Sequence, residues 1–235
     1  MKKFSTYLIW SLTISSYGQD FEFPSLKREA QTVQEFSPNG WFVSDSIQGD
    51  LNRDNLIDQV FVIKKRDSVT VKDKNGDEYI IQPRVIAIAF KNANNKYVLT
   101  ETNQRLLTNF NFPPTYNDPF NLMTIEKGVL TIQFSFDYTN GNFIFYNYKF
   151  RFQKNEFSLI GAEVEYVTRR TMDFKKSSYN FLTRKWSLTI GTHTNQDPPK
   201  LTEETKWFPL NIKEVRNFKT IDRPGTWLIL KESWL

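Results

Sequence analysis

The chain has 235 residues, no cysteine and a formal net charge of +5. The absence of cysteine excludes disulfides, thiol nucleophiles, cysteine-ligated zinc and the lipid anchor of a lipoprotein, which requires a cysteine at the cleavage site. Nucleic-acid binding usually requires a concentrated basic patch. Here the basic residues are scattered, and the run Lys64-Lys65-Arg66 is short. We therefore expect no nucleic-acid partner.

Residues 1–18 have the features of a secretory signal peptide. Lys2 and Lys3 form a short basic start, residues 4–14 are mostly apolar, and small residues lead to a cleavage site after Gly18. The apolar stretch is shorter than the ~20 residues that span a bilayer, and no later segment is apolar enough to cross a membrane. The sequence predicts export to the periplasm or the extracellular space, without a membrane span.

Residues 19–235 are predicted to form a single, mainly antiparallel β domain with few short helices. Aromatic residues make up 16% of the chain, and period-two alternation recurs along it. Only 21–35 and 202–215 have patterns compatible with a short helix. The expected strands are 41–47, 59–64, 84–90, 96–101, 121–126, 129–136, 143–152, 157–167, 179–183, 186–191 and 226–231.

The stretch "GDLNRDNLIDQVFV" (49–62) spaces oxygen-bearing residues as a cation-binding loop does. A calcium ion takes six to eight oxygen ligands, and a tight loop that presents alternate side chains gathers them compactly. The expected ligands are the side chains of Asp50, Asn52, Asp54 and Asp58 and the backbone carbonyl of Leu56. Since such a set leaves little coordination open for a substrate, we expect a structural Ca²⁺.

The loop is not an EF-hand, because Phe61 stands where the bidentate Glu of that motif belongs and an apolar strand pattern follows. It resembles the D-x-[DN]-x-D-[GN]-x-x-D loops of FG-GAP/VCBS-type, integrin-α-like repeats, in which a loop after a Gly leads into an apolar strand. This resemblance covers residues 49–62 and implies the five ligands above. Segments such as "SSYNFLTRKW" also look like exported proteins of Bacteroidetes-type bacteria, without implying an activity.

The alternative interpretation of 49–62 is a polar turn in which Asp and Asn side chains cap backbone amides. The chain has one good copy of this loop motif, at 49–62, and shows no repeat of fixed period. Both observations disfavour a complete propeller, which is built from several repeats. The sheets are therefore expected as an antiparallel meander or sandwich, or as a partial propeller.

Two hairpins are predicted further along the chain. Asn75-Gly76 lies between two strand-like segments, and Asn140-Gly141 joins 129–136 to 143–152, which then turns into 157–167 to complete a meander. The uniformly apolar "RVIAIAF" (84–90) predicts a strand buried on both faces. The Pro-rich loop that ends at residue 200 is the best candidate for a boundary, with a C-terminal extension from about 197.

Few residues have a pattern that indicates catalysis. Glu163 and Glu165 share one face of a strand, where a solvated surface is the simpler interpretation than a carboxylate pair. His193 is the only histidine, and the chain has no nucleophile elbow, H-E-x-x-H, P-loop or dinucleotide fingerprint. Tyr146 and its neighbours on 143–152 favour core packing over a sugar-stacking platform.

The sequence thus predicts an exported, soluble binding or interaction module with one structural calcium loop and without catalysis. Its partner is an unidentified protein or glycan, and its oligomeric state is open. Two alternatives remain. One is an extracytoplasmic hydrolase, with glycans as one possible substrate class, whose carboxylate site is not located. The other is an immunity or inhibitor protein.

Overall fold

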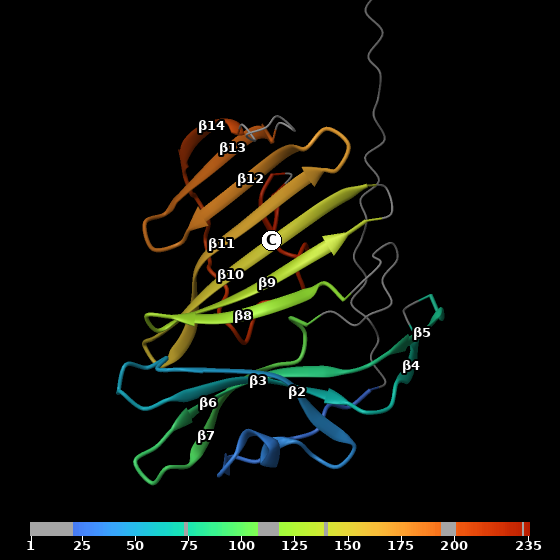
Figure 1. Cartoon of the computed structure of the whole chain (residues 1–235), viewed down its shortest axis with the longest axis vertical. Helices are drawn as coiled ribbons and strands as arrows, with labels where there is room; N and C mark the ends of the chain where they lie inside the picture. Colours follow the sequence, from blue (N-terminus) through green and yellow to red (C-terminus); the bar gives the residue numbers. More distant parts are fainter. Residues whose placement is uncertain (1–20, 73–74, 108–117, 139–140, 194–200, 232) are drawn as a thin grey trace, which may run out of the picture.

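A computed structural model describes residues 21–72, 75–107, 118–138, 141–193, 201–231 and 233–235. Its strands form two antiparallel sheets, with the five-stranded sheet at the lower end of Figure 1 and the seven-stranded sheet above it. The strand order is β1-β7-β6-β3-β2 in the smaller sheet and β14-β13-β12-β11-β10-β9-β8 in the larger one. The mainly antiparallel β fold expected from the sequence is confirmed. The predicted signal peptide lies outside the described residues.

The five-stranded sheet contains β1 (Glu29–Ala30), β2 (Trp41–Gly49), β3 (Asp58–Lys65), β6 (Arg84–Lys91) and β7 (Tyr97–Asn103). The seven-stranded sheet contains β8 (Phe120–Glu126), β9 (Val129–Asp137), β10 (Asn142–Gln153), β11 (Glu156–Thr168), β12 (Asp173–Asn180), β13 (Lys185–His193) and β14 (Leu201–Pro209). Two separate hairpins are β4 (Val69–Lys72) with β5 (Glu78–Ile81) and β15 (Leu228–Leu230) with β16 (Ser233–Trp234). A 3₁₀ helix, η1, covers Val33–Phe36.

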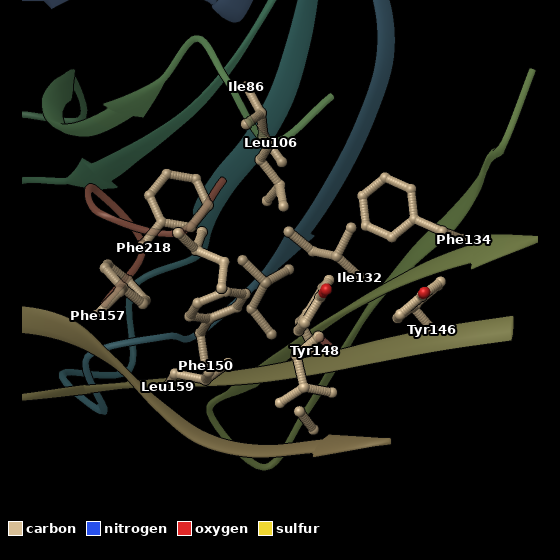
Figure 2. Packing of buried hydrophobic residues seen from close by; sticks show 14 of the residues in the cluster. Ile86, Leu106, Ile132, Phe134, Tyr146, Tyr148, Phe150, Phe157, Leu159 and Phe218 are labelled. Atoms are coloured by element: carbon tan, nitrogen blue, oxygen red, sulfur yellow. The ribbon is translucent and has the colours of Figure 1, made fainter. Parts of the chain in front are cut away.

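The main core lies between the two sheets. Alternate side chains of β3 and β6, including Val60 and Ile88, pack against the inner face of the larger sheet. Figure 2 shows Ile86 and Leu106 on one side of this core, facing the aromatic rings of Tyr148 and Phe150 on the other. Burying apolar surface on this scale is the dominant stabilising contribution to such a fold.

A second core covers the opposite face of the five-stranded sheet. Phe61, Ile63 and Val85 pack there against Phe36 of η1 and Trp41 of β2. β3 and β6 are therefore buried on both faces, as the apolar run 84–90 predicts. This arrangement explains why these two strands lack period-two alternation.

The predicted meander of β9, β10 and β11 is present, with inward side chains at Leu130, Ile132, Phe134 and Phe136. Gly141 has φ +82°, as the tight turn requires, whereas Asn140 lies outside the described residues. The β4–β5 hairpin forms around Gly76, at φ +87°.

The short helix with which the pattern of 202–215 is compatible does not form, because residues 201–209 form β14 and pair along their whole length with β13. The 21–35 segment holds the short strand β1 and most of the short 3₁₀ helix η1. Chain from residue 210 onward packs into the main core through Phe218, Ile221 and Leu235. Asn103 of β7 holds this C-terminal segment in place. Its side-chain amide donates hydrogen bonds to the carbonyls of Phe218 and Ile221 at 2.6 and 2.9 Å.

Candidate functional site

The acidic loop joins β2 to β3, and Asp50 is its central hydrogen-bond acceptor. The amides of Arg53 and Asp54 donate to Asp50 Oδ1 at 2.6 and 3.2 Å, and the amide of Asn55 donates to Oδ2 at 3.0 Å. Arg53 and Asn55 adopt φ of 66° and 67°, which turns the backbone sharply enough to bring these amides together. Asp50 thereby organises the first half of the loop.

Asn52 and Asp54 order the tip of the loop. The Asn52 side-chain amide donates to Asp54 Oδ2 at 2.8 Å, and the Asp54 amide donates to Asn52 Oδ1 at 3.1 Å. The amide of Leu56 donates to Asp54 Oδ1 at 2.8 Å. Three of the predicted ligand side chains, those of Asp50, Asn52 and Asp54, therefore lie within one hydrogen-bonded turn.

Asp58 has a different environment, because its side chain is fully buried at the start of β3. The amide of Leu51 donates to its Oδ2 at 2.9 Å, and the amide of Lys91, at the end of β6, donates to its Oδ1 at 3.0 Å. Burial raises the pKa of Asp58, the charge of Asp54 adds to this effect, and the backbone hydrogen bonds oppose it. Asp58 thus joins the loop to the neighbouring strand β6.

These contacts are the backbone-capping interactions of the alternative interpretation of 49–62. These hydrogen bonds leave some oxygen lone pairs of the loop free. A carboxylate offers about four acceptor positions, and the Asp54 carboxylate accepts two hydrogen bonds. No group of three or more His, Cys, Asp or Glu side chains suited to a metal ion occurs in the part of the chain that the structure describes. Calcium binding by Asp50, Asn52, Asp54, Leu56 and Asp58 stays a prediction.

A groove runs along β2, the strand that leads into this loop. It encloses about 630 Å³ and is lined by Gln34, Ser37, Pro38, Asn39, Gly40, Arg66 and β2 residues 41–46. β2 is the terminal strand of its sheet, and Ser44, Asp45 and Ser46 are exposed. Near Gly49 the strand approaches β8, since an added Cβ there would lie 2.7 Å from Ile125. The open part of the edge is therefore residues 41–46.

A β-bulge lies in the middle of this open edge. The pairing of β2 with β3 shifts by one residue between Val43 and Asp45. Before the shift Trp41 and Val43 pack into the second core, and after it Ile47 packs against the main core. The bulge thus lets one strand serve both cores and interrupts the regular edge at Ser44.

Arg66 is the basic residue among the described residues that line the groove, and Asp45 of β2 is the acidic one. The Arg66 guanidinium lies over the Phe42 ring at 5.2 Å from the centroid, and the Arg66 backbone amide donates to the Gly40 carbonyl at 2.8 Å. The Ser37 hydroxyl oxygen is buried and has no hydrogen-bond partner among the described residues. The groove thus offers an oriented guanidinium and strand backbone to a ligand.

The other residues considered from sequence do not form a site. Glu163 accepts a hydrogen bond from the Ser178 hydroxyl at 3.1 Å and lies 4.0 Å from the ammonium groups of Lys149 and Lys176. Glu165 faces Lys176 across the strands. These residues form a solvated ladder of alternating charge.

Tyr146 is buried in the main core together with Tyr148 and Phe150, which confirms the core interpretation of this strand. His193 is the last residue of β13 and pairs with Leu201, and residues 194–200 lie outside the described part.

Two notable residues were missed in the sequence. Arg66 was grouped with a run of surface basic residues, although it lines the groove. Glu101 of β7 is buried, its Oε1 accepts the Phe157 amide at 3.1 Å, and its Oε2 has no hydrogen-bond partner within the described residues. No local pattern marks either residue, because their partners are distant in the chain.

Within the described residues, no helix is long and apolar enough to cross a membrane. Comparison with protein-family models, with curated proteins and with solved structures finds no match to this chain.

Proposed function

We propose that the protein is an exported, non-catalytic binding module whose binding surface is the groove along β2. Its ligand is an extended polypeptide segment that carries an acidic side chain. The observation that supports this proposal is the position of the Arg66 guanidinium, held over Phe42 beside the open edge of β2.

The ligand class follows from the groups in the groove. A guanidinium held in one orientation recognises a carboxylate through two parallel hydrogen bonds. The unpaired backbone groups of a terminal strand pair with another extended backbone. Because the bulge at Ser44 interrupts the edge, backbone pairing is limited to a few residues. Side-chain contacts to Arg66 would then supply most of the selectivity.

The proposal assigns the acidic loop a supporting role. Ca²⁺ bound by Asp50, Asn52 and Asp54, with Leu56 and Asp58, would hold the end of β2 and so keep the groove in shape. Free lone pairs on Asp54 support this assignment. The signal peptide expected at residues 1–18 agrees with a function outside the cytoplasm.

Peptide binding can be tested by fluorescence anisotropy. The probes are labelled flexible peptides with Glu at alternate positions and matched peptides with Lys there. We expect the Glu peptides to bind more tightly and Arg66→Glu to weaken them at least about tenfold, since a charge-assisted bond is worth ~1.5–3 kcal/mol. Arg170→Glu, an exposed charge reversal in the β11–β12 turn, is the control. Equal binding of both peptide sets, or no effect of Arg66→Glu, would contradict the proposal.

Calcium binding can be tested by thermal unfolding with Ca²⁺ or with a chelator. Extracellular calcium modules have dissociation constants of ~10⁻⁴–10⁻³ M, so about 5 mM Ca²⁺ would stabilise the folded state by ~1–2.3 kcal/mol. We expect a shift at millimolar Ca²⁺ that Asp54→Ala removes. Asp67→Ala, with a side chain 86% exposed, is the control. An unchanged melting temperature of the wild type at millimolar Ca²⁺ would refute calcium binding.

A further inference from the structure

β14 presents a long and regular open edge at the end of the seven-stranded sheet. All nine of its residues pair with β13 in one continuous register, and among the described strands none pairs with its other side. Residues 202–209 are all exposed. In Figure 1 this strand lies at the end of the molecule farthest from the five-stranded sheet. Unlike β2, this edge carries no bulge that would discourage strand pairing.

Large aromatic side chains are exposed on both faces of this edge. Trp207 is 66% exposed. Phe208 is 36% exposed and stacks on Trp186 of β13, with ring centroids 4.7 Å apart. Trp186 in turn stacks on Tyr179 of β12. The edge therefore carries exposed aromatic rings that are anchored in the sheet, and exposed aromatic residues of this size are typical of interfaces.

The charged residues of β14 have a symmetric arrangement. Thr205 is the central residue of the strand, and Glu204 and Lys206 flank it on the face that carries Phe208. Within one chain the Lys206 ammonium lies 3.1 Å from Glu204 Oε1, and both side chains are well exposed. Opposite charges placed equally on either side of a strand centre are self-complementary under a twofold axis.

We propose that β14 pairs antiparallel with β14 of a second copy of this chain, about a twofold axis through Thr205. In this register each residue lies opposite the residue equally far from Thr205 in the other copy. Glu204 of each copy then lies opposite Lys206 of the other, on the same face, and two cross-strand ion pairs form. Trp207 of each copy covers the aliphatic part of Glu203 of the other.

Other registers lack these pairings. In a continuous sheet, opposing residues of the two strands lie on the same face. The twofold axis must therefore pass through a residue, and a change of register moves the axis from one residue to another. A centre at Glu204 or at Lys206 places that charge opposite its own copy, which is unfavourable. The centre at Thr205 also overlaps Leu201–Pro209 completely. The strand sequence therefore selects a single arrangement of the two copies.

Crosslinking through an introduced cysteine tests the arrangement directly, because the chain has no cysteine of its own. Opposing Cβ atoms in antiparallel strands lie ~4.5–5.5 Å apart, close to the separation that a disulfide bridges. Under mild oxidation we expect Thr205→Cys to form a covalent dimer on non-reducing gels. Ser46→Cys, on the open edge of β2, is the control and should give no covalent dimer on the same gels. No covalent dimer of Thr205→Cys would overturn the proposal.

Charge reversal tests the register by sedimentation velocity. Glu204→Lys and Lys206→Glu each place like charges opposite one another and should raise the dimer dissociation constant about tenfold or more. The double variant restores both ion pairs and should dimerise as the wild type does. A 1:1 mixture of the two single variants should also form dimers. A monomeric wild type, or a double variant as weak as the single variants, would refute pairing about Thr205.

Discussion

Asp58→Asn perturbs the hydrogen bonds of the acidic loop without changing the size of the side chain. In the wild type each carboxylate oxygen of Asp58 accepts one backbone amide, from Leu51 and from Lys91. Asn has one acceptor oxygen, and its NH₂ group takes the place of the other. One of the two amides then faces a donor in a fully buried site.

The expected cost follows from the loss of that acceptor. A buried donor without a partner costs ~1–3 kcal/mol, and the remaining bond to a neutral oxygen is weaker than a bond to a carboxylate. Removing a buried charge offsets part of this cost, because burial raises the pKa of Asp58. We expect a net destabilisation of about 2 kcal/mol. For a protein of this size that corresponds to a melting temperature lower by roughly 4–8 °C.

The assay is thermal unfolding at neutral pH in the presence of a chelator, so that ion binding does not contribute. Asp67→Asn, in the turn between β3 and β4, is the exposed control and should leave the melting temperature unchanged. An Asp58→Asn protein that melts within about one degree of the wild type would refute the argument that both amides depend on this carboxylate.

Three further predictions concern buried polar groups. Burial, followed by the charge of Glu156, raises the pKa of Glu101 above its ordinary value of 4.5, while the Phe157 amide and Lys219 oppose the shift. The stabilising contribution of protonated Glu101 is therefore lost as the pH rises from 4.5 through the raised pKa of the folded state. In urea unfolding between pH 4.5 and 7.5, the free energy of unfolding of Glu101→Gln should rise relative to that of the wild type. A difference between the two proteins that stays constant with pH would contradict this prediction. The Tyr148 hydroxyl is buried without a partner among the described residues, so Tyr148→Phe should raise the free energy of unfolding by about 1 kcal/mol. Tyr179→Phe loses its hydrogen bond with the Ser233 hydroxyl and should lower it by ~0.5–1.5 kcal/mol, and equal effects of the two variants would refute the distinction.

Local patterns in the sequence were sufficient to predict the strands whose side chains alternate or are uniformly apolar. The alternation in 129–136 and the Asn-Gly turn predict the meander, and the apolar run 84–90 predicts a strand buried on both faces. The failure at 202–215 has a physical cause. Residues 202–209 are exposed on both faces, so burial leaves no periodic signal, and pairing with β13 decides their conformation.

The candidate site divides in the same way. The sequence alone determined that Asp50, Asn52 and Asp54 share one tight loop, because residues this close in the chain need only a turn to meet. Only the tertiary structure placed Asp58 against the Lys91 amide and Arg66 beside Phe42. Those contacts join segments brought together by strand pairing and core burial. They depend on long-range hydrogen bonds and packing that short sequence patterns do not encode.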